Sequence, residues 1–107
     1  MQDEKNIAKM VSLICKIESY TKDLDFDGFA KDDMLVEACV FNLAQLGEVA
    51  HKVSNEIISL HPEIAWNDMY GLRNRLVHDY EGVKPIVVWE IISIDLPVLR
   101  SQLENIF

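Results

Sequence analysis

Residues 31–53, KDDMLVEACVFNLAQLGEVAHKV, decide the fold of this chain of 107 residues. Apolar residues recur in this stretch at three- and four-residue steps, which is the spacing of a helix face, and they form two stripes rather than one. One stripe holds Leu35, Ala38, Cys39, Leu46, Val49 and Val53, and the other holds Val36, Val40, Leu43 and Ala50. A helix that is apolar on two sides is typically central in a helical bundle.

Three polar or small residues of this stretch carry further expectations. Asp32 or Asp33 is expected to cap the helix, because a short acidic side chain can accept a hydrogen bond from a first-turn N–H. Gly47 costs a helix up to about 1 kcal/mol relative to alanine, so we expect another backbone to approach closely there. Asn42 lies between apolar neighbours and is interpreted as a buried, hydrogen-bonded amide.

The rest of the chain is also predicted to be helical, over residues 3–21, 55–60, 62–78 and 85–107, with a loop over 23–29. One apolar face of the first helix is made by Ile7, Met10, Val11, Ile14 and Ile17, and that of the third by Ala65, Met69, Leu72 and Leu76. Pro62 suits a first helical turn, whereas Pro97 should kink or break the last helix. We therefore expect an all-α, up-and-down bundle of four to five helices, with a kinked last helix, in a single domain over residues 1–107.

Composition limits the binding partners and the cellular compartment expected for this domain. The formal net charge is −8, which opposes non-specific binding to nucleic acid and suits a basic protein partner. No apolar run has the roughly 18 residues of a membrane span, and residues 1–5 do not resemble a signal peptide, so a cytoplasmic protein is expected. Cys15 and Cys39 are predicted to be buried free thiols of a reducing compartment.

Residues 73–80, RNRLVHDY, hold the side chains suited to chemistry. On a helical wheel Arg73 and Tyr80 share one face, and Asn67, Asn74 and His78 share a second polar face away from the core stripe. Histidine can move protons near neutral pH, and the arginine fork fits a phosphate. Together they can cleave a phosphodiester without a metal, and RNA supplies its own nucleophile in the 2′-hydroxyl.

The spacing of the two charged residues constrains this chemistry. Arg73 and His78 lie about 140° apart around an ideal helix. Either the helix ends before His78, or residues of two protomers combine. A purely structural bundle stays open at this point, because histidine and arginine near a helix C-terminus are also favoured by the helix dipole.

The arrangement of an arginine, four residues, a histidine, one residue and a tyrosine resembles the signature of the HEPN-domain family, and specifically its HepT ribonuclease toxins. The resemblance extends to residues 44–50, AQLGEVA, and 64–69, IAWNDM, and to VWE at 88–90 and DLPVL at 95–99. It covers most of the chain from Asp32 onwards.

The resemblance implies a homodimeric, HEPN-like bundle that acts as a metal-independent RNA endonuclease in a two-gene toxin–antitoxin system. The implied antitoxin is an MntA-like nucleotidyltransferase, which transfers AMP from ATP to the motif tyrosine; the chain itself would need no cofactor. By position, Arg73 and His78 would be catalytic, Asn74 supporting and Tyr80 modified. The alternative is a non-catalytic dimeric adaptor that binds the nucleotidyltransferase and presents Tyr80 to it.

Residues near the motif receive simpler interpretations. Glu48 could hydrogen-bond the motif from the neighbouring helix or be a solvated charge, and Asn67 could support the catalytic pair. The two tryptophans, Trp66 and Trp89, are expected in the core or in a dimer contact rather than as base-stacking platforms. The two remaining histidines, His51 and His61, are expected at the surface or at helix ends.

Overall fold

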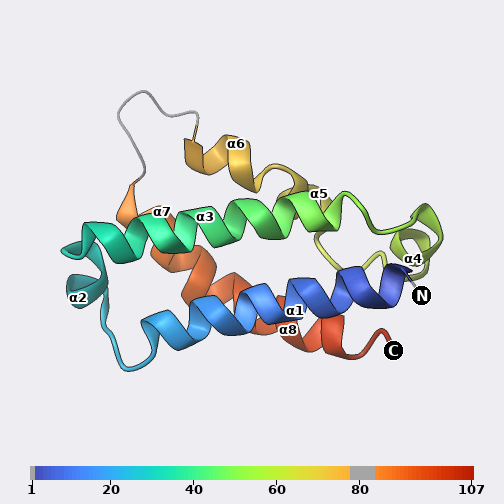
Figure 1. Ribbon diagram of the computed structural model, residues 1–107, viewed down its shortest axis with the longest axis horizontal. Helices are drawn as coiled ribbons and strands as arrows, with labels where there is room; N and C mark the ends of the chain where they lie inside the picture. Colours follow the sequence, from blue (N-terminus) through green and yellow to red (C-terminus); the bar gives the residue numbers. More distant parts are fainter. Residues whose placement is uncertain (1, 78–83) are drawn as a thin grey trace.

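The computed structural model describes residues 2–77 and 84–107, apart from the side chains of Arg73 and Val77. The elements are α1 (Gln2–Thr21), α2 (Phe26–Ala30), α3 (Asp33–Ala50), α4 (Asn55–Leu60), α5 (Trp66–Tyr70), α6 (Leu72–Val77), α7 (Pro85–Glu90), the π-helix η1 (Ile91–Asp95) and α8 (Leu96–Glu104). Four rods alternate in direction: α1, α3, the α5–α6 pair and the α7–η1–α8 run (Figure 1). The predicted all-α bundle is confirmed.

Helix α3 is the central rod, as its two apolar stripes predicted. Both stripes supply buried residues, among them Cys39 and Leu46 from one and Val36, Leu43 and Ala50 from the other. The helix contacts α1 on one side and α5 and α6 on another. Each rod therefore buries its own stripe against α3 and its neighbours, which is the arrangement that the hydrophobic effect favours.

The local expectations for α3 are confirmed. The Asp32 carboxylate accepts a hydrogen bond from the Leu35 N–H at 3.1 Å and caps the helix. The buried Asn42 amide donates to the Ala38 carbonyl at 2.8 Å. A Cβ at Gly47 would lie 2.5 Å from the carbonyl oxygen of Met69, so the backbone of α5 approaches α3 there.

The loop predicted over residues 23–29 is wrong, because α2 occupies most of it. The Asp25 carboxylate accepts a hydrogen bond from the Gly28 N–H at 2.8 Å and caps this short helix. Phe26 and Phe29, three residues apart, both lie against Trp89 of α7, with ring centroids 6.4 and 5.1 Å from it. Tertiary burial of the two rings stabilises a helix too short to be visible as a periodic pattern.

The start of the helix predicted over 62–78 is also wrong, since α5 begins at Trp66 and Pro62 lies in the turn before it. The chain reverses in that turn, where the Ile64 N–H donates to the carbonyl of His61 at 3.2 Å. The buried Trp66 indole donates to the same carbonyl at 3.0 Å. These two hydrogen bonds hold residues 61–66 in a turn, and a regular helix over the same residues could not form both of them. The predicted helix is further divided at Gly71, between α5 and α6.

The irregularity expected at Pro97 takes the form of a π-helical turn. Proline has no N–H and its ring collides with the carbonyl four residues earlier in a regular helix. Directly before Pro97 the chain widens into η1, where the Leu96 N–H donates to the Ile91 carbonyl five residues back. The last rod thus stays helical from Pro85 to Glu104 without a break.

The cysteine prediction is half correct. Cys39 is fully buried, and this burial raises the pKa of its thiol to about 11, whereas Cys15 is exposed on the outer side of α1; both are free. Trp66 is buried and Trp89 is partly buried against the core, so the core interpretation of the tryptophans is confirmed. Among the described residues, no helix is both long and apolar enough to cross a bilayer.

The close approach at Gly47 yields the first prediction. Gly47→Ala should lower the free energy of unfolding by about 1–3 kcal/mol, because the new methyl group would displace the α5 backbone. Gly71→Ala is the matched control, since its Cβ would meet nothing nearer than the Asn67 carbonyl oxygen at 3.7 Å. That variant should be as stable as the parent or more stable by up to about 1 kcal/mol. Thermal unfolding followed by circular dichroism measures both, and an undisturbed Gly47→Ala variant would contradict the packing described.

Candidate active site

The predicted catalytic motif is carried by α6 and the residues that follow it. The backbone of Arg73 and the whole of Asn74 lie in α6, and Asn74 is exposed. His78 and Tyr80 lie outside the described residues. The structure therefore brings Arg73 and Asn74 together on one helix, and the meeting of Arg73 with His78 stays a prediction.

Two leucines fix α6 against the bundle. Leu72 and Leu76 are buried, and Leu72 Cβ would lie 3.9 Å from a Cβ at Gly47. Helix α6 packs on α3, while Asn74 and Arg75 face the solvent between the two anchors. The motif thus begins on a short helix whose buried side is fully used by the core and whose polar side is free for a ligand.

The helical phase continues across Gly71, although α5 and α6 are separate elements. The backbone of Gly71 is right-handed, its N–H donates to the Asn67 carbonyl at 3.2 Å, and its own carbonyl accepts from the Arg75 N–H at 2.9 Å. Asn67 and Asn74 are both exposed. These positions are compatible with the polar face that the helical wheel assigns to Asn67 and Asn74.

Of the supporting residues, Glu48 is exposed on α3 next to Gly47, at the contact between α3 and α5. His51 is the C-cap residue of α3 and His61 that of α4, so the interpretation of both as surface or cap residues is confirmed. Within the described residues, no group of three or more histidine, cysteine, aspartate or glutamate side chains is placed to hold a metal ion.

One feature beside the motif was not predicted from the sequence. The imidazole of His51 stacks on the phenol ring of Tyr70, with the centroids 4.3 Å apart and the planes 18° from parallel. Burial raises the pKa of the Tyr70 hydroxyl above its ordinary value. The sequence signal was indirect: His51 follows Gly47 by four residues, and Tyr70 adjoins Met69, so the close approach of the two backbones also brings these rings together.

A groove of about 300 Å³ runs along the other side of the α5–α6 rod, between it and η1 and α8. Its floor is apolar and includes Leu46, Met69 and Leu99. Its rim carries the carboxylates of Asp68 and Asp95 together with Arg75, so both signs of charge border the groove.

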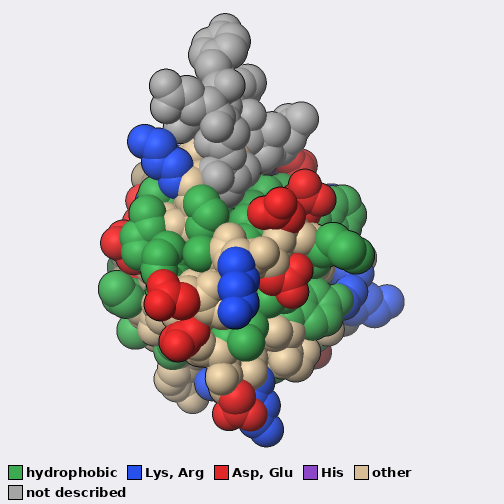
Figure 2. All heavy atoms as spheres, turned by 90° about the vertical axis from the view of Figure 1, so that its left-hand side faces the viewer, with side chains coloured by type: hydrophobic (Ala, Val, Ile, Leu, Met, Phe, Trp, Pro, Cys, Tyr) green, Lys and Arg blue, Asp and Glu red, His purple; other side chains and the backbone are tan. Residues whose placement is uncertain are grey.

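The described lysine and arginine side chains on one end of the bundle stand singly among acidic and hydrophobic ones (Figure 2). The described part of this face therefore shows no broad basic patch to which a nucleic-acid backbone could bind.

Comparisons with known proteins assign the chain to one family. The family described as "Ribonuclease HepT-like" matches residues 10–106. The chain is 32% identical to the "Probable ribonuclease HepT" of Thermococcus cleftensis over 102 residues, which are 95% of this chain and 90% of that protein. It is 33% identical to "Putative RNase MJ1380" of Methanocaldococcus jannaschii over 85 residues, 79% of this chain and 78% of the relative. No solved structure matches the chain significantly.

This chain belongs to the family of HepT-like ribonucleases. The resemblance inferred from the motif and its flanks is thereby confirmed, and so is the enzyme class of ribonuclease at the level of the family. The match covers all of the elements from α2 to α8 and about half of α1, and it includes α3 and α5, against which α6 packs.

Proposed function

We propose that this chain is a metal-independent RNA endonuclease, the toxin of a two-gene toxin–antitoxin pair, which acts in the cytoplasm as a homodimer. The family match over residues 10–106, which includes the complete motif from Arg73 to Tyr80, carries the proposal. The exposed position of Asn74 beside Arg73 supports it, because a substrate phosphate can reach that side of α6.

The proposed reaction uses three side chains. The 2′-hydroxyl of RNA attacks the adjacent phosphorus, and the bond from that phosphorus to the 5′-oxygen breaks. His78 either accepts the proton that the 2′-hydroxyl loses or donates the proton that the leaving 5′-oxygen gains. Arg73 stabilises the negative charge on the phosphoryl oxygens. Asn74, four residues before His78, is at the spacing of neighbours on a helix face and can orient the imidazole.

The second prediction concerns assembly. We expect a two-fold dimer with the face of Asn67, Asn74 and His78 near the axis, because one protomer alone leaves Arg73 and His78 about 140° apart on a continuous helix. Multi-angle light scattering at micromolar concentration should give twice the mass of the chain. A strict monomer that still cleaves RNA would contradict a site built from two protomers.

The third prediction concerns catalysis. His78→Ala should lower kcat for RNA cleavage by roughly 10²- to 10⁴-fold through loss of proton transfer. Arg73→Ala should remove most cleavage through loss of charge stabilisation. The assay is cleavage of total RNA in the presence of a chelator. Arg75→Ala on the same helix is the matched control and should cleave normally.

Two outcomes would contradict this mechanism. Undiminished cleavage by folded His78→Ala protein would exclude the histidine as the proton carrier. Cleavage that requires a divalent ion would replace the mechanism by a metal-dependent one.

The fourth prediction concerns regulation by an MntA-like nucleotidyltransferase antitoxin, which uses ATP as the AMP donor. AMP on Tyr80 should silence cleavage, because its phosphate can pair with Arg73 and its negative charge repels incoming RNA. Incubation with the antitoxin and ATP should add mass in AMP steps to the intact protein but not to a Tyr80→Phe variant. Modified protein that still cleaves RNA would refute the switch, and unmodified protein that never cleaves would favour the adaptor.

A further inference from the structure

The stacked rings of His51 and Tyr70 lie at the edge of the core, because Tyr70 packs against the core while His51 is exposed. The other aromatic pairs among the described residues join Phe26 and Phe29 to Trp89, at the contact of α2 with α7. His51 is exposed and Tyr70 is only partly buried, so this pair keeps solvent-accessible ring surface. A rigid aromatic surface of this kind is the usual feature that stacks unpaired bases.

The fold holds the pair in place from both sides. Gly47 lies against the carbonyl of Met69. His51 follows Gly47 by one helical turn, and Tyr70 directly follows Met69. The ring of each residue limits the rotation of the other at a centroid distance of 4.3 Å. Little conformational entropy then remains to be lost when a base stacks on the pair.

The pair also adjoins the motif. Tyr70 precedes Arg73 by three residues and Asn74 by four, and the helical bonds across Gly71 keep these positions on neighbouring parts of one face. One turn corresponds to about 5.4 Å along the axis. Bases stacked in one strand rise by about 3.4 Å each, so a strand with its phosphate at the motif reaches the pair within about two nucleotides.

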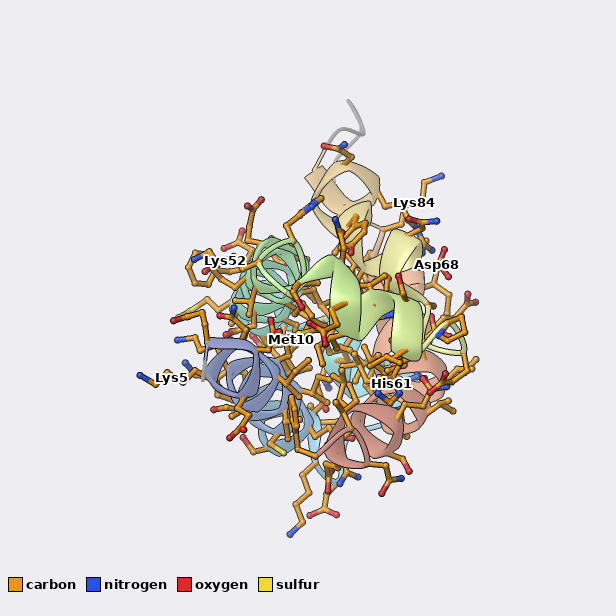
Figure 3. All side chains as sticks on the ribbon, turned by 90° about the vertical axis from the view of Figure 1, so that its right-hand side faces the viewer. Lys5, Met10, Lys52, His61, Asp68 and Lys84 are labelled. Carbon is orange, nitrogen blue, oxygen red and sulfur yellow. The ribbon has the colours of Figure 1, made fainter. Side chains whose placement is uncertain are left out.

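The charges around the pair favour stacking over phosphate contacts. Lys52, directly after His51, is exposed and can meet one phosphate, while Glu48 lies four residues before it and offsets its charge. Figure 3 shows Lys52 and Asp68 on opposite sides of the bundle, so the Asp68 carboxylate lies away from Lys52. The net charge of −8 opposes non-specific binding of RNA, so a contact that does not depend on charge is of advantage.

We propose that His51 and Tyr70 form a stacking platform for an unpaired base of a single-stranded RNA whose phosphate binds at the motif. The inference rests on the proposed function, and it adds to it a binding site for a base close to the phosphate that is cleaved. A base inside a duplex already stacks on its neighbours, so the platform discriminates against double-stranded RNA. Because every base has a π face, the platform tolerates different sequences.

The experiment measures binding of a fluorescent single-stranded 2′-O-methyl RNA of a dozen nucleotides by anisotropy. This probe is not cleaved, because its 2′-oxygen carries no proton to lose, so binding is measured apart from activity. His51→Ala and Tyr70→Ala should each raise the Kd roughly 5- to 100-fold, the range of one base–aromatic stack. Tyr70→Phe keeps the ring and should bind like the parent.

Matched controls are a histidine and a tyrosine elsewhere on the surface. His61→Ala at the end of α4 and Tyr20→Ala near the end of α1 should leave the Kd unchanged. With unmodified RNA, the platform variants should raise KM and leave kcat unchanged. A 2′-O-methyl probe with one abasic site at the stacking position should weaken binding to the parent protein but not to His51→Ala.

Each outcome separates the platform from the nuclease. If folded His51→Ala binds and cleaves RNA like the parent, the platform is refuted and the nuclease stands. Because His51 is exposed, this variant is expected to fold, so it tests the platform even if Tyr70→Ala unfolds. Binding that depends on the platform without any cleavage refutes the nuclease and supports the platform. If the parent protein binds neither single-stranded nor duplex RNA, both proposals fail. If it binds single-stranded and duplex RNA with the same Kd, the platform is refuted.

Discussion

The contact between Gly47 of α3 and the Met69 carbonyl of α5 is the constraint on which the site depends. It brings two backbones closer than any side chain with a Cβ would allow, since that atom would lie 2.5 Å from the oxygen. This approach sets how far Leu72 and Leu76 enter the core, and therefore which residues of α6 stay outside. The same contact places His51 against Tyr70. A helix-weakening glycine in the central rod is thus explained by tertiary packing rather than by local preference.

The fold could be predicted where local pattern and burial coincide. The two stripes and the cap of α3 depend on residues a few positions apart, and their burial follows directly from the periodicity. The start of α5 could not be predicted, because it depends on the Trp66 indole reaching the His61 carbonyl. Likewise α2 depends on two phenylalanine rings meeting Trp89, a residue far away in the chain. These contacts leave no periodic signal in the sequence.

The candidate site, like the fold, could be predicted from the sequence only in part. The chemistry and spacing of the motif residues left a structural interpretation open, and their resemblance to HepT ribonucleases favoured a catalytic one; the family match supports the assignment as a ribonuclease. Helical hydrogen bonds join Asn67 to Gly71 and Gly71 to Arg75 across the division between α5 and α6, which is compatible with one polar face for Asn67 and Asn74. The stacked pair of His51 and Tyr70 was missed, because its members belong to different helices and only the packing at Gly47 joins them.

The acidity of the chain is compatible with an RNA substrate once its distribution is considered. The carboxylates of Glu63, Asp68 and Asp95 border the groove between the α5–α6 rod and the last rod. A helix with its side chains is about 10–12 Å across, whereas the Debye length at physiological ionic strength is about 8 Å. Repulsion from a carboxylate on the opposite side of a helix is therefore largely screened, while an arginine–phosphate contact and a base–ring stack act at short range. Local contacts, not net charge, decide whether this surface accepts a strand of RNA.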